Sequence, residues 1–176
     1  MWSKILLIGF RATGKTTIGK RVAELLGWEF RDADEEIEKN IGKSIKEIVE
    51  EKGWPFFREL EREYLKDLQK LKKVVCALGG GAVLHQEEIK VLREDSFIVA
   101  LKADLGVIKN RLKKDYKTFT QRPSLTPLDW ETEVEKLYVE RLPHYENIAH
   151  VVLDTSNTSV EDLAIRIVEK FNREKF

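Results

Sequence analysis

The segment from Gly9 to Thr16 fits the pattern G-x-x-x-x-G-K-[ST]. An apolar run at Ile5–Ile8 leads into it, and a helical pattern at Thr16–Leu26 leads out. Glycines let such a loop turn so that its backbone N–H groups point at phosphate oxygens, and the helix N-terminus adds positive potential. A glycine turn before an ordinary helix is the alternative, but a chance match is expected in roughly one chain of this length per hundred. The pattern therefore predicts a loop that binds nucleotide phosphates.

Individual residues of this loop have expected tasks. Lys15 should reach the β- and γ-phosphates of ATP, and the Thr16 hydroxyl should bind Mg²⁺. Arg11 departs from the small residues that are commoner at its position, which should be tolerable because its side chain can point to solvent. The residues expected to bind ATP in this segment are Ala12, Thr13, Gly14, Lys15, Thr16 and Thr17.

Short apolar runs alternate with longer amphipathic stretches along the chain. Five runs are expected to be strands, namely Ile5–Ile8, Trp28–Arg31, Val74–Leu78, Phe97–Leu101 and Val151–Leu153. Strands that alternate with helices form parallel sheets covered on both faces. The sequence therefore predicts a three-layer α/β/α fold with a five-stranded parallel sheet, of the P-loop NTPase type. We expect a single domain over residues 1–176, with an irregular segment at about residues 113–128 as a mobile lid.

Several helix ends can be predicted. Ser44 and Glu47 form a capping-box pattern, and Gly53 should end the helix that begins there. Pro55 suits the first turn of a longer helix that reaches Leu71. Pro143 should kink or interrupt a late amphipathic helix.

Composition argues against several classes of partner. Lys plus Arg and Asp plus Glu both number 31, so the formal net charge is zero and gives no overall attraction to nucleic acid or to an anionic membrane. No stretch approaches the roughly 20 apolar residues of a membrane helix. Cys76 is the only cysteine, so no internal disulfide can form, which fits a reducing compartment. We expect a cytoplasmic protein without nucleic-acid or membrane partners.

Two carboxylates, Asp32 and Asp34, follow the second expected strand. Ligands of open parallel sheets bind beyond the carboxyl ends of the strands. One carboxylate can hold the hydration shell of Mg²⁺, and the other can accept a hydrogen bond from a substrate hydroxyl. The alternative is that Asp34 only caps the helix that follows it.

Arginines and glycines supply the remaining candidates. Arg58 lies on the helix that begins at Pro55, where a surface position or an i,i+3 pair with Glu61 is the ordinary alternative. Gly79, Gly80 and Gly81 follow a buried strand and suit a close approach of a ligand to the main chain, or else a plain turn. Arg122 lies in the irregular segment and Arg141 in a late helix. A planar guanidinium suits a carboxylate, and a lid arginine suits a transferred phosphoryl group.

The order and spacing of these motifs resemble those of the shikimate kinases, which are P-loop kinases related to the nucleoside monophosphate kinases. The resemblance covers almost the whole chain. After the glycine loop it rests on Asp32-x-Asp34, Phe57-Arg58-x-x-Glu61, Gly79-Gly80-Gly81-Ala82, Gln121-Arg122-Pro123, and Arg141 before Pro143 and Tyr145. It implies transfer of the γ-phosphoryl group of ATP to the 3-hydroxyl of shikimate.

The resemblance also implies residue roles. Asp34 binds the ring hydroxyls and assists the attacking one, while Arg58 and Arg141 clamp the carboxylate beside the glycine run. Arg122 is the lid arginine on ATP, and Arg111 packs against adenine with the loop after Asp154 on its other side. Thr16 and Asp32 hold Mg²⁺, with Asp32 acting through water. The implied chemistry needs Lys15, Asp34 and Arg122. A monomer is expected.

Three alternatives remain open from the residues themselves. Gluconate is also a polyhydroxy carboxylate, so a gluconate kinase of the same architecture shares much of the pattern. A nucleoside monophosphate kinase needs a base pocket, for which the segment after Asp34 leaves little room. A guanine-specific switch or a non-catalytic nucleotide module is the third alternative, although no Asn-Lys-x-Asp element is present. The pattern favours the enzyme.

Overall fold

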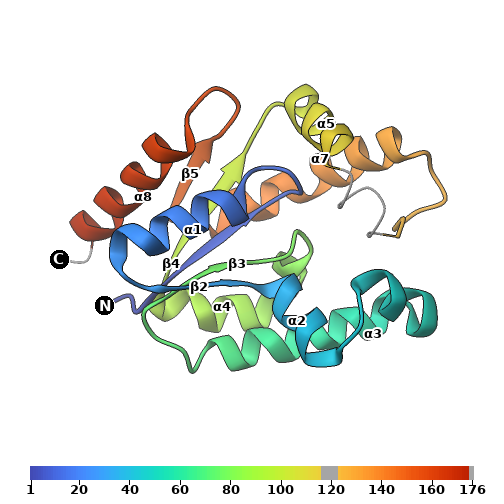
Figure 1. Ribbon diagram of the computed structural model, residues 1–176, viewed down its shortest axis with the longest axis horizontal. Helices are drawn as coiled ribbons and strands as arrows, with labels where there is room; N and C mark the ends of the chain where they lie inside the picture. The colour runs from blue at the N-terminus through green and yellow to red at the C-terminus, as the bar shows by residue number, and fades with distance from the viewer. Residues whose placement is uncertain (116–122, 175–176) are drawn as a thin grey trace.

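The computed structural model describes residues 1–115 and 123–174, and in this part of the chain five parallel strands form one sheet. The strands are β1 (Lys4–Gly9), β2 (Glu29–Asp32), β3 (Val74–Ala77), β4 (Ser96–Lys102) and β5 (Val151–Asp154). Their spatial order is β2-β3-β1-β4-β5, so the strand that carries the glycine loop is central (Figure 1). The predicted five-stranded parallel sheet is confirmed.

Helices cover both faces of the sheet. They are α1 (Lys15–Leu26), α2 (Ala33–Ile41), α3 (Ile45–Leu68), α4 (Gln86–Asp95), α5 (Leu105–Lys114), α7 (Trp130–Ile148) and α8 (Val160–Glu174), with a short 3₁₀ turn, η1, at Ala82–Leu84. Figure 1 shows α1 and α8 together on one face and α3 and α4 on the other. The prediction missed α4 and η1.

The central strand explains why two layers form. Its side chains alternate between the two faces, as they must in a strand. Ile5 and Leu7 pack with the buried residues of α1 and α8, whereas Leu6 and Ile8 pack with those of α3, α4 and α7. All four side chains are at most 1% exposed, which is the continuous apolar run expected of a strand buried on both faces.

The helix ends confirm some predictions and correct others. Ser44 and Glu47 form the predicted capping box, and Gly53 leaves helical geometry with φ 81° and ψ 168°, although α3 resumes beyond it. Asp32 caps α2, because its carboxylate accepts from the N–H groups of residues 34 and 35. The expected interruption at Pro143 does not occur, because α7 runs through it. The carbonyl that Pro143 leaves unpaired belongs to Val139, which is 68% exposed and open to water.

Two further observations bear on the expected partners. None of the helices in the described ranges is long and apolar enough to cross a membrane. Cys76 is a free, fully buried thiol in β3.

Candidate functional site

The glycine loop joins β1 to α1 in the geometry that its sequence predicts. Gly9 has φ 146° and Gly14 has φ 96°, both in the region that favours glycine. A Cβ atom on Gly9 would lie 2.3 Å from the carbonyl oxygen of Leu101, so no other residue fits there. The Lys15 ammonium group donates to the carbonyls of Gly9 and Phe10, at 2.8 Å each. The lysine is thereby held at the loop itself.

An oxygen pair lies at the start of α1. Thr16 Oγ1 donates to Asp32 Oδ2 at 2.7 Å, while Asp32 Oδ1 accepts from the backbone N–H of Asp34 at 3.1 Å. The alternative that Asp34 is the helix cap is therefore wrong, because Asp32 has that role, whereas Asp34 lines the pockets described next. Hydroxyl and carboxylate oxygens beside a phosphate-binding loop are ligands that Mg²⁺ prefers, so the pair fits this ion.

Two pockets meet beside the loop. The first, which we call the loop pocket, is lined by Lys15, Thr16, Asp32 and neighbouring loop residues. The second, which we call the arginine pocket, is lined by Arg58, Arg141, Glu61, Trp54 and neighbouring residues. Residues that line both pockets are Arg11, Asp34, Gly79 and Gly80. A group bound in the loop pocket can therefore meet a group bound in the arginine pocket, and Asp34 lies where the two pockets join.

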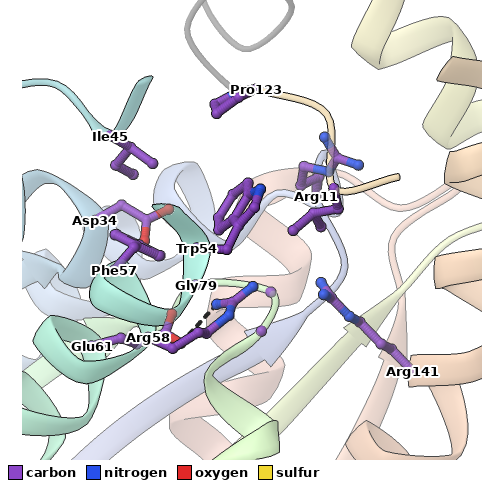
Figure 2. A pocket seen from close by; sticks show the side chains of 13 residues that line it. Arg11, Asp34, Ile45, Trp54, Phe57, Arg58, Glu61, Gly79, Pro123 and Arg141 are labelled. Atoms are coloured by element: carbon purple, nitrogen blue, oxygen red, sulfur yellow. Dashed lines mark hydrogen bonds and ion pairs between the residues drawn. The ribbon is translucent and has the colours of Figure 1, made fainter. Parts of the chain in front are cut away.

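The two arginines that are expected to bind a carboxylate, Arg58 and Arg141, come from different helices. Figure 2 shows Arg58 extending from α3 and Arg141 extending from α7 toward the same space. Arg141 is only 8% exposed, and the Arg58 side chain is 22% exposed. The Arg58 guanidinium lies 5.3 Å from the Trp54 ring centre and 5.6 Å from that of Phe57, within range of cation–π attraction. The structure thus brings together the arginines that the sequence separates by more than 80 positions.

The glycine run after β3 allows these side chains to approach the main chain. A Cβ atom on Gly79 would lie 2.8 Å from Asp34 Oδ1, and one on Gly81 would lie 2.3 Å from Arg58 Nη1. At Gly80 the nearest atom is the Tyr145 hydroxyl oxygen at 3.5 Å. A side chain at the first or third glycine would therefore displace the carboxylate of Asp34 or the guanidinium of Arg58.

Glu61 is a residue that the sequence analysis did not assign to the site. Its carboxylate is 2% exposed, and Oε1 accepts from Arg58 Nη1 at 2.8 Å and bonds His85 Nε2 at 2.9 Å. Burial alone raises the pKa of this carboxyl group, but the hydrogen bond from His85 and the charge and hydrogen bond of Arg58 outweigh it, so the pKa is lowered. Glu61 is therefore a buried anion that needs its partners.

Tyr145 also contributes to the pocket without having been assigned to it. Its hydroxyl group donates to the carbonyl of Gly80 at 2.5 Å, and the side chain is 1% exposed. Burial raises the pKa of Tyr145 to about 12, despite the opposing effect of the Arg141 charge. The phenol is thus a neutral donor that holds the glycine run in place.

A third pocket lies on the other side of the glycine loop. Arg111 Nη1 donates to the carbonyl of Ala12 at 3.0 Å, and Nη2 donates to the carbonyl of Thr155 at 2.7 Å. Thr155 Oγ1 in turn donates to the carbonyl of Thr13 at 2.9 Å. This network places Arg111 between the loop and the segment after Asp154, and Thr13, Thr17 and Thr158 are among the pocket's lining residues. The packing of Arg111 against adenine stays a prediction.

The expected lid lies partly outside the described residues. Arg122 is among the residues 116–122 that the structure does not describe, so its position stays a prediction. Directly after them, Pro123 and Leu125 line the arginine pocket. The buried carboxylate of Glu133 accepts from Ser124 Oγ at 2.9 Å and from two backbone N–H groups at residues 125 and 126. The Trp54 indole N–H donates to the Ser124 carbonyl at 3.2 Å, so this segment is attached to both α3 and α7.

The Arg11 side chain, which the sequence would allow to point to solvent, borders the site instead. It is half-buried, lines both the loop pocket and the arginine pocket, and lies 5.4 Å from the Phe10 ring centre. The sequence alone does not reveal that the third position of the loop faces the arginine pocket.

Comparisons with known proteins agree with this geometry. A family model described as shikimate kinase matches residues 11–172. A shikimate kinase from Syntrophus aciditrophicus is 37% identical over 180 residues, which cover 98% of this chain and 92% of the relative. One from Thermodesulfovibrio yellowstonii is 41% identical over 169 residues, covering 96% and 95%. The structure of an Acinetobacter baumannii shikimate kinase in complex with shikimate aligns with a TM-score of 0.89 and 33% identity, covering 100% of this chain and 96% of that one.

Proposed function

Because this chain belongs to the shikimate kinase family, we propose that it transfers the γ-phosphoryl group of ATP to the 3-hydroxyl of shikimate. The observation that carries the proposal is the position of Asp34 where the loop pocket meets the arginine pocket. Phosphoryl transfer needs positioning and charge neutralisation more than covalent chemistry. A carboxylate at this junction can orient an acceptor hydroxyl toward a phosphate bound by the loop.

The donor half of the proposed site is the glycine loop. Backbone N–H groups of the loop and the Lys15 ammonium group bind the phosphates of ATP. Arg111 and the segment at Thr155 border the pocket for the nucleoside. Arg122, on the proposed lid at residues 113–128, neutralises charge on the transferred phosphoryl group.

Thr16 and Asp32 are the residues that would hold Mg²⁺. Their oxygens lie 2.7 Å apart at the start of α1, beside the loop. Mg²⁺ bound there would neutralise charge on the β- and γ-phosphates. Asp32 also caps α2, so the same carboxylate fixes the helix that carries Asp34.

The acceptor half is the arginine pocket. Arg58 and Arg141 bind the shikimate carboxylate, and the run Gly79, Gly80 and Gly81 lets the ring lie against the main chain. Asp34 accepts a hydrogen bond from the 3-hydroxyl and takes up its proton as the new O–P bond forms, while the bond from the γ-phosphorus to the β,γ-bridging oxygen breaks and ADP leaves. The arginine pocket excludes water from the reacting groups when the lid covers it.

We further propose that residues 1–176 form one kinase domain that works as a cytoplasmic monomer, with small molecules as its only partners. The buried single thiol and the absence of a membrane-crossing helix in the described ranges are compatible with this. Light scattering coupled to size-exclusion chromatography would measure the oligomeric state.

The deciding experiment is an ADP-release assay with Mg·ATP and shikimate, gluconate or a nucleoside monophosphate as acceptor. We expect turnover with shikimate that collapses in Arg58→Ala. Arg62→Ala is the matched control, because Arg62 lies one turn further along α3 with its side chain 45% exposed and outside the arginine pocket. Turnover with gluconate or a nucleotide instead would overturn the acceptor, and no turnover with any acceptor would favour a binding module.

A further inference from the structure

A buried histidine shares a carboxylate oxygen with the acceptor clamp. His85 is 5% exposed, and its Nε2 lies 2.9 Å from Glu61 Oε1. The same oxygen accepts from Arg58 Nη1 at 2.8 Å. Glu61 is thus held between one residue that contacts the arginine pocket and one that does not line it.

Capping of α4 does not explain the presence of a histidine at position 85. The residue precedes α4, but its side chain makes no capping hydrogen bond to that helix. Its backbone N–H donates to the carbonyl of Ala82 and needs no imidazole for that purpose. The His85 side chain forms a hydrogen bond with Glu61, which argues for a task that depends on that carboxylate.

The Arg58 guanidinium is confined on three sides. Gly81 borders it so closely that an added Cβ atom would lie 2.3 Å from Nη1, and the rings of Trp54 and Phe57 lie 5.3 Å and 5.6 Å away. Glu61 is the remaining restraint, and it fixes Nη1 through an ion pair. A carboxylate that could rotate would not hold the guanidinium at one angle, and carboxylate recognition by arginine depends on that angle.

We infer that His85 is a positioning residue for the acceptor: its imidazole fixes the rotamer of Glu61, and Glu61 in turn fixes the Arg58 guanidinium against the glycine run. This inference rests on the proposed function, because it assumes that Arg58 binds the acceptor carboxylate. His85 itself touches no reacting atom.

The test compares variants at His85 with a matched exposed histidine. His85→Leu replaces the donor with a bulky apolar side chain, and His85→Gln places an amide nitrogen near the position of Nε2. We expect His85→Leu to raise the KM for shikimate about tenfold, as the loss of a buried charged hydrogen bond can do, while kcat and the KM for ATP stay within about twofold. His85→Gln should restore most of the affinity. His144→Leu is the control, because His144 is exposed on α7.

A double-mutant cycle separates this role from a structural one. If His85 acts through the clamp, His85→Leu should change shikimate affinity less than about twofold in an Arg58→Met background. An equal loss in both backgrounds, or a loss of thermal stability with an unchanged KM for shikimate, would overturn the inference. If the Leu variant does not fold, His85→Gln and His85→Asn decide instead, since the shorter Asn amide does not reach Glu61. Equal KM values for those two variants would then refute the role of Nε2.

These outcomes are distinct from a failure of the proposed function. Wild-type protein that does not phosphorylate shikimate would overturn the function before any variant is compared. Wild-type protein that does so, with His85→Leu indistinguishable from it, would overturn only the role of His85.

Discussion

Gly81→Ala tests whether the main chain at the end of β3 sets the position of the Arg58 clamp. The added Cβ atom would lie 2.3 Å from Nη1 and 2.5 Å from Cζ and Nη2 of Arg58. Contacts of a Cβ atom below 3.4 Å are rare, so the guanidinium must move by about 1 Å. A left-handed backbone does not complicate the result, because Gly81 has φ −93° and ψ −2°, which is allowed for alanine.

The size of the effect follows from that displacement. The guanidinium must move while Glu61 is held by His85, so the 2.8 Å ion pair between Arg58 and Glu61 is stretched. A misplacement of about 1 Å in a group that positions substrate can cost about 100-fold. We therefore expect kcat/KM for shikimate to fall by roughly 30- to 100-fold, or about 2–3 kcal/mol, with the KM for ATP nearly unchanged.

A coupled ADP-release assay and calorimetric titration with shikimate measure this effect. Gly106→Ala is the matched control, because it makes the same chemical change in the first turn of α5, where nothing lies within 4 Å of the added Cβ. That variant should keep wild-type activity and gain about 0.5–1 kcal/mol of stability. If Gly81→Ala also keeps its affinity for shikimate, the clamp is not set by the main chain and the reasoning fails.

Three further predictions concern other parts of the molecule. Asp95→Asn should lower the free energy of unfolding by about 2 kcal/mol in urea titration. The substitution removes the carboxylate that lies 2.6 Å from the ammonium group of the fully buried Lys4, while the 41% exposure of Asp95 limits the loss. Burial raises the pKa of Asp95, but the hydrogen bonds from Lys4 and Ser3 lower it by more, so its net pKa lies below the ordinary value. The wild type should therefore lose this stabilisation as the pH falls through the folded-state pKa of Asp95, and the variant should not. Burial raises the pKa of Cys76 to about 12, so a thiol reagent at pH 8 should label it only as the protein unfolds. Tyr145→Phe removes the donor to the Gly80 carbonyl and should cost about 1 kcal/mol of stability and raise the KM for shikimate severalfold.

Local patterns predicted the elements whose cause is local. The glycine loop, the strands and the capping box at Ser44 all depend on neighbours within a few positions, and all are present. The helix α4 was missed because it begins soon after the glycine run and buries only Ile89 and Leu92, too few positions for a helical period to be read. The cap of α2 lies two positions before Asp34, the alternative that the sequence offered, since either Asp32 or Asp34 suits that position in sequence alone.

Packing between segments that are distant in the sequence determines the features of the site that local patterns did not predict. In the sequence, an i,i+3 pair of Arg58 with Glu61 looks like an ordinary pair on the surface of a helix. The pair does form, but the Glu61 side chain is only 2% exposed, so it is not a surface pair. Its burial depends on η1, which returns the chain to α3 and brings His85 against the carboxylate, 24 positions away. The triple glycine was the available signal for that close packing. Nothing within a few positions of Arg11 indicated that its side chain lines two pockets.

The charge balance of the arginine pocket leads to a last prediction, for Arg11→Met. The pocket is lined by three arginines and by the carboxylates of Asp34 and Glu61, so positive groups exceed negative ones by one. Arg11 is the one of these arginines that also lines the loop pocket, where transfer brings negative charge toward the acceptor. A unit charge about 7 Å away at an effective dielectric constant of about 30 contributes about 1.5 kcal/mol.

We therefore expect Arg11→Met to lower kcat/KM for shikimate by about tenfold. Arg11→Lys should recover part of that loss, because it restores the charge without the planar guanidinium. Arg21→Met is the control, since Arg21 pairs with Glu24 and Glu161 on the exposed side of α1 and lines neither pocket. An Arg11→Met variant within twofold of the wild type would mean that Lys15 and the clamp supply all the positive charge that transfer requires, and that Arg11 only borders the site.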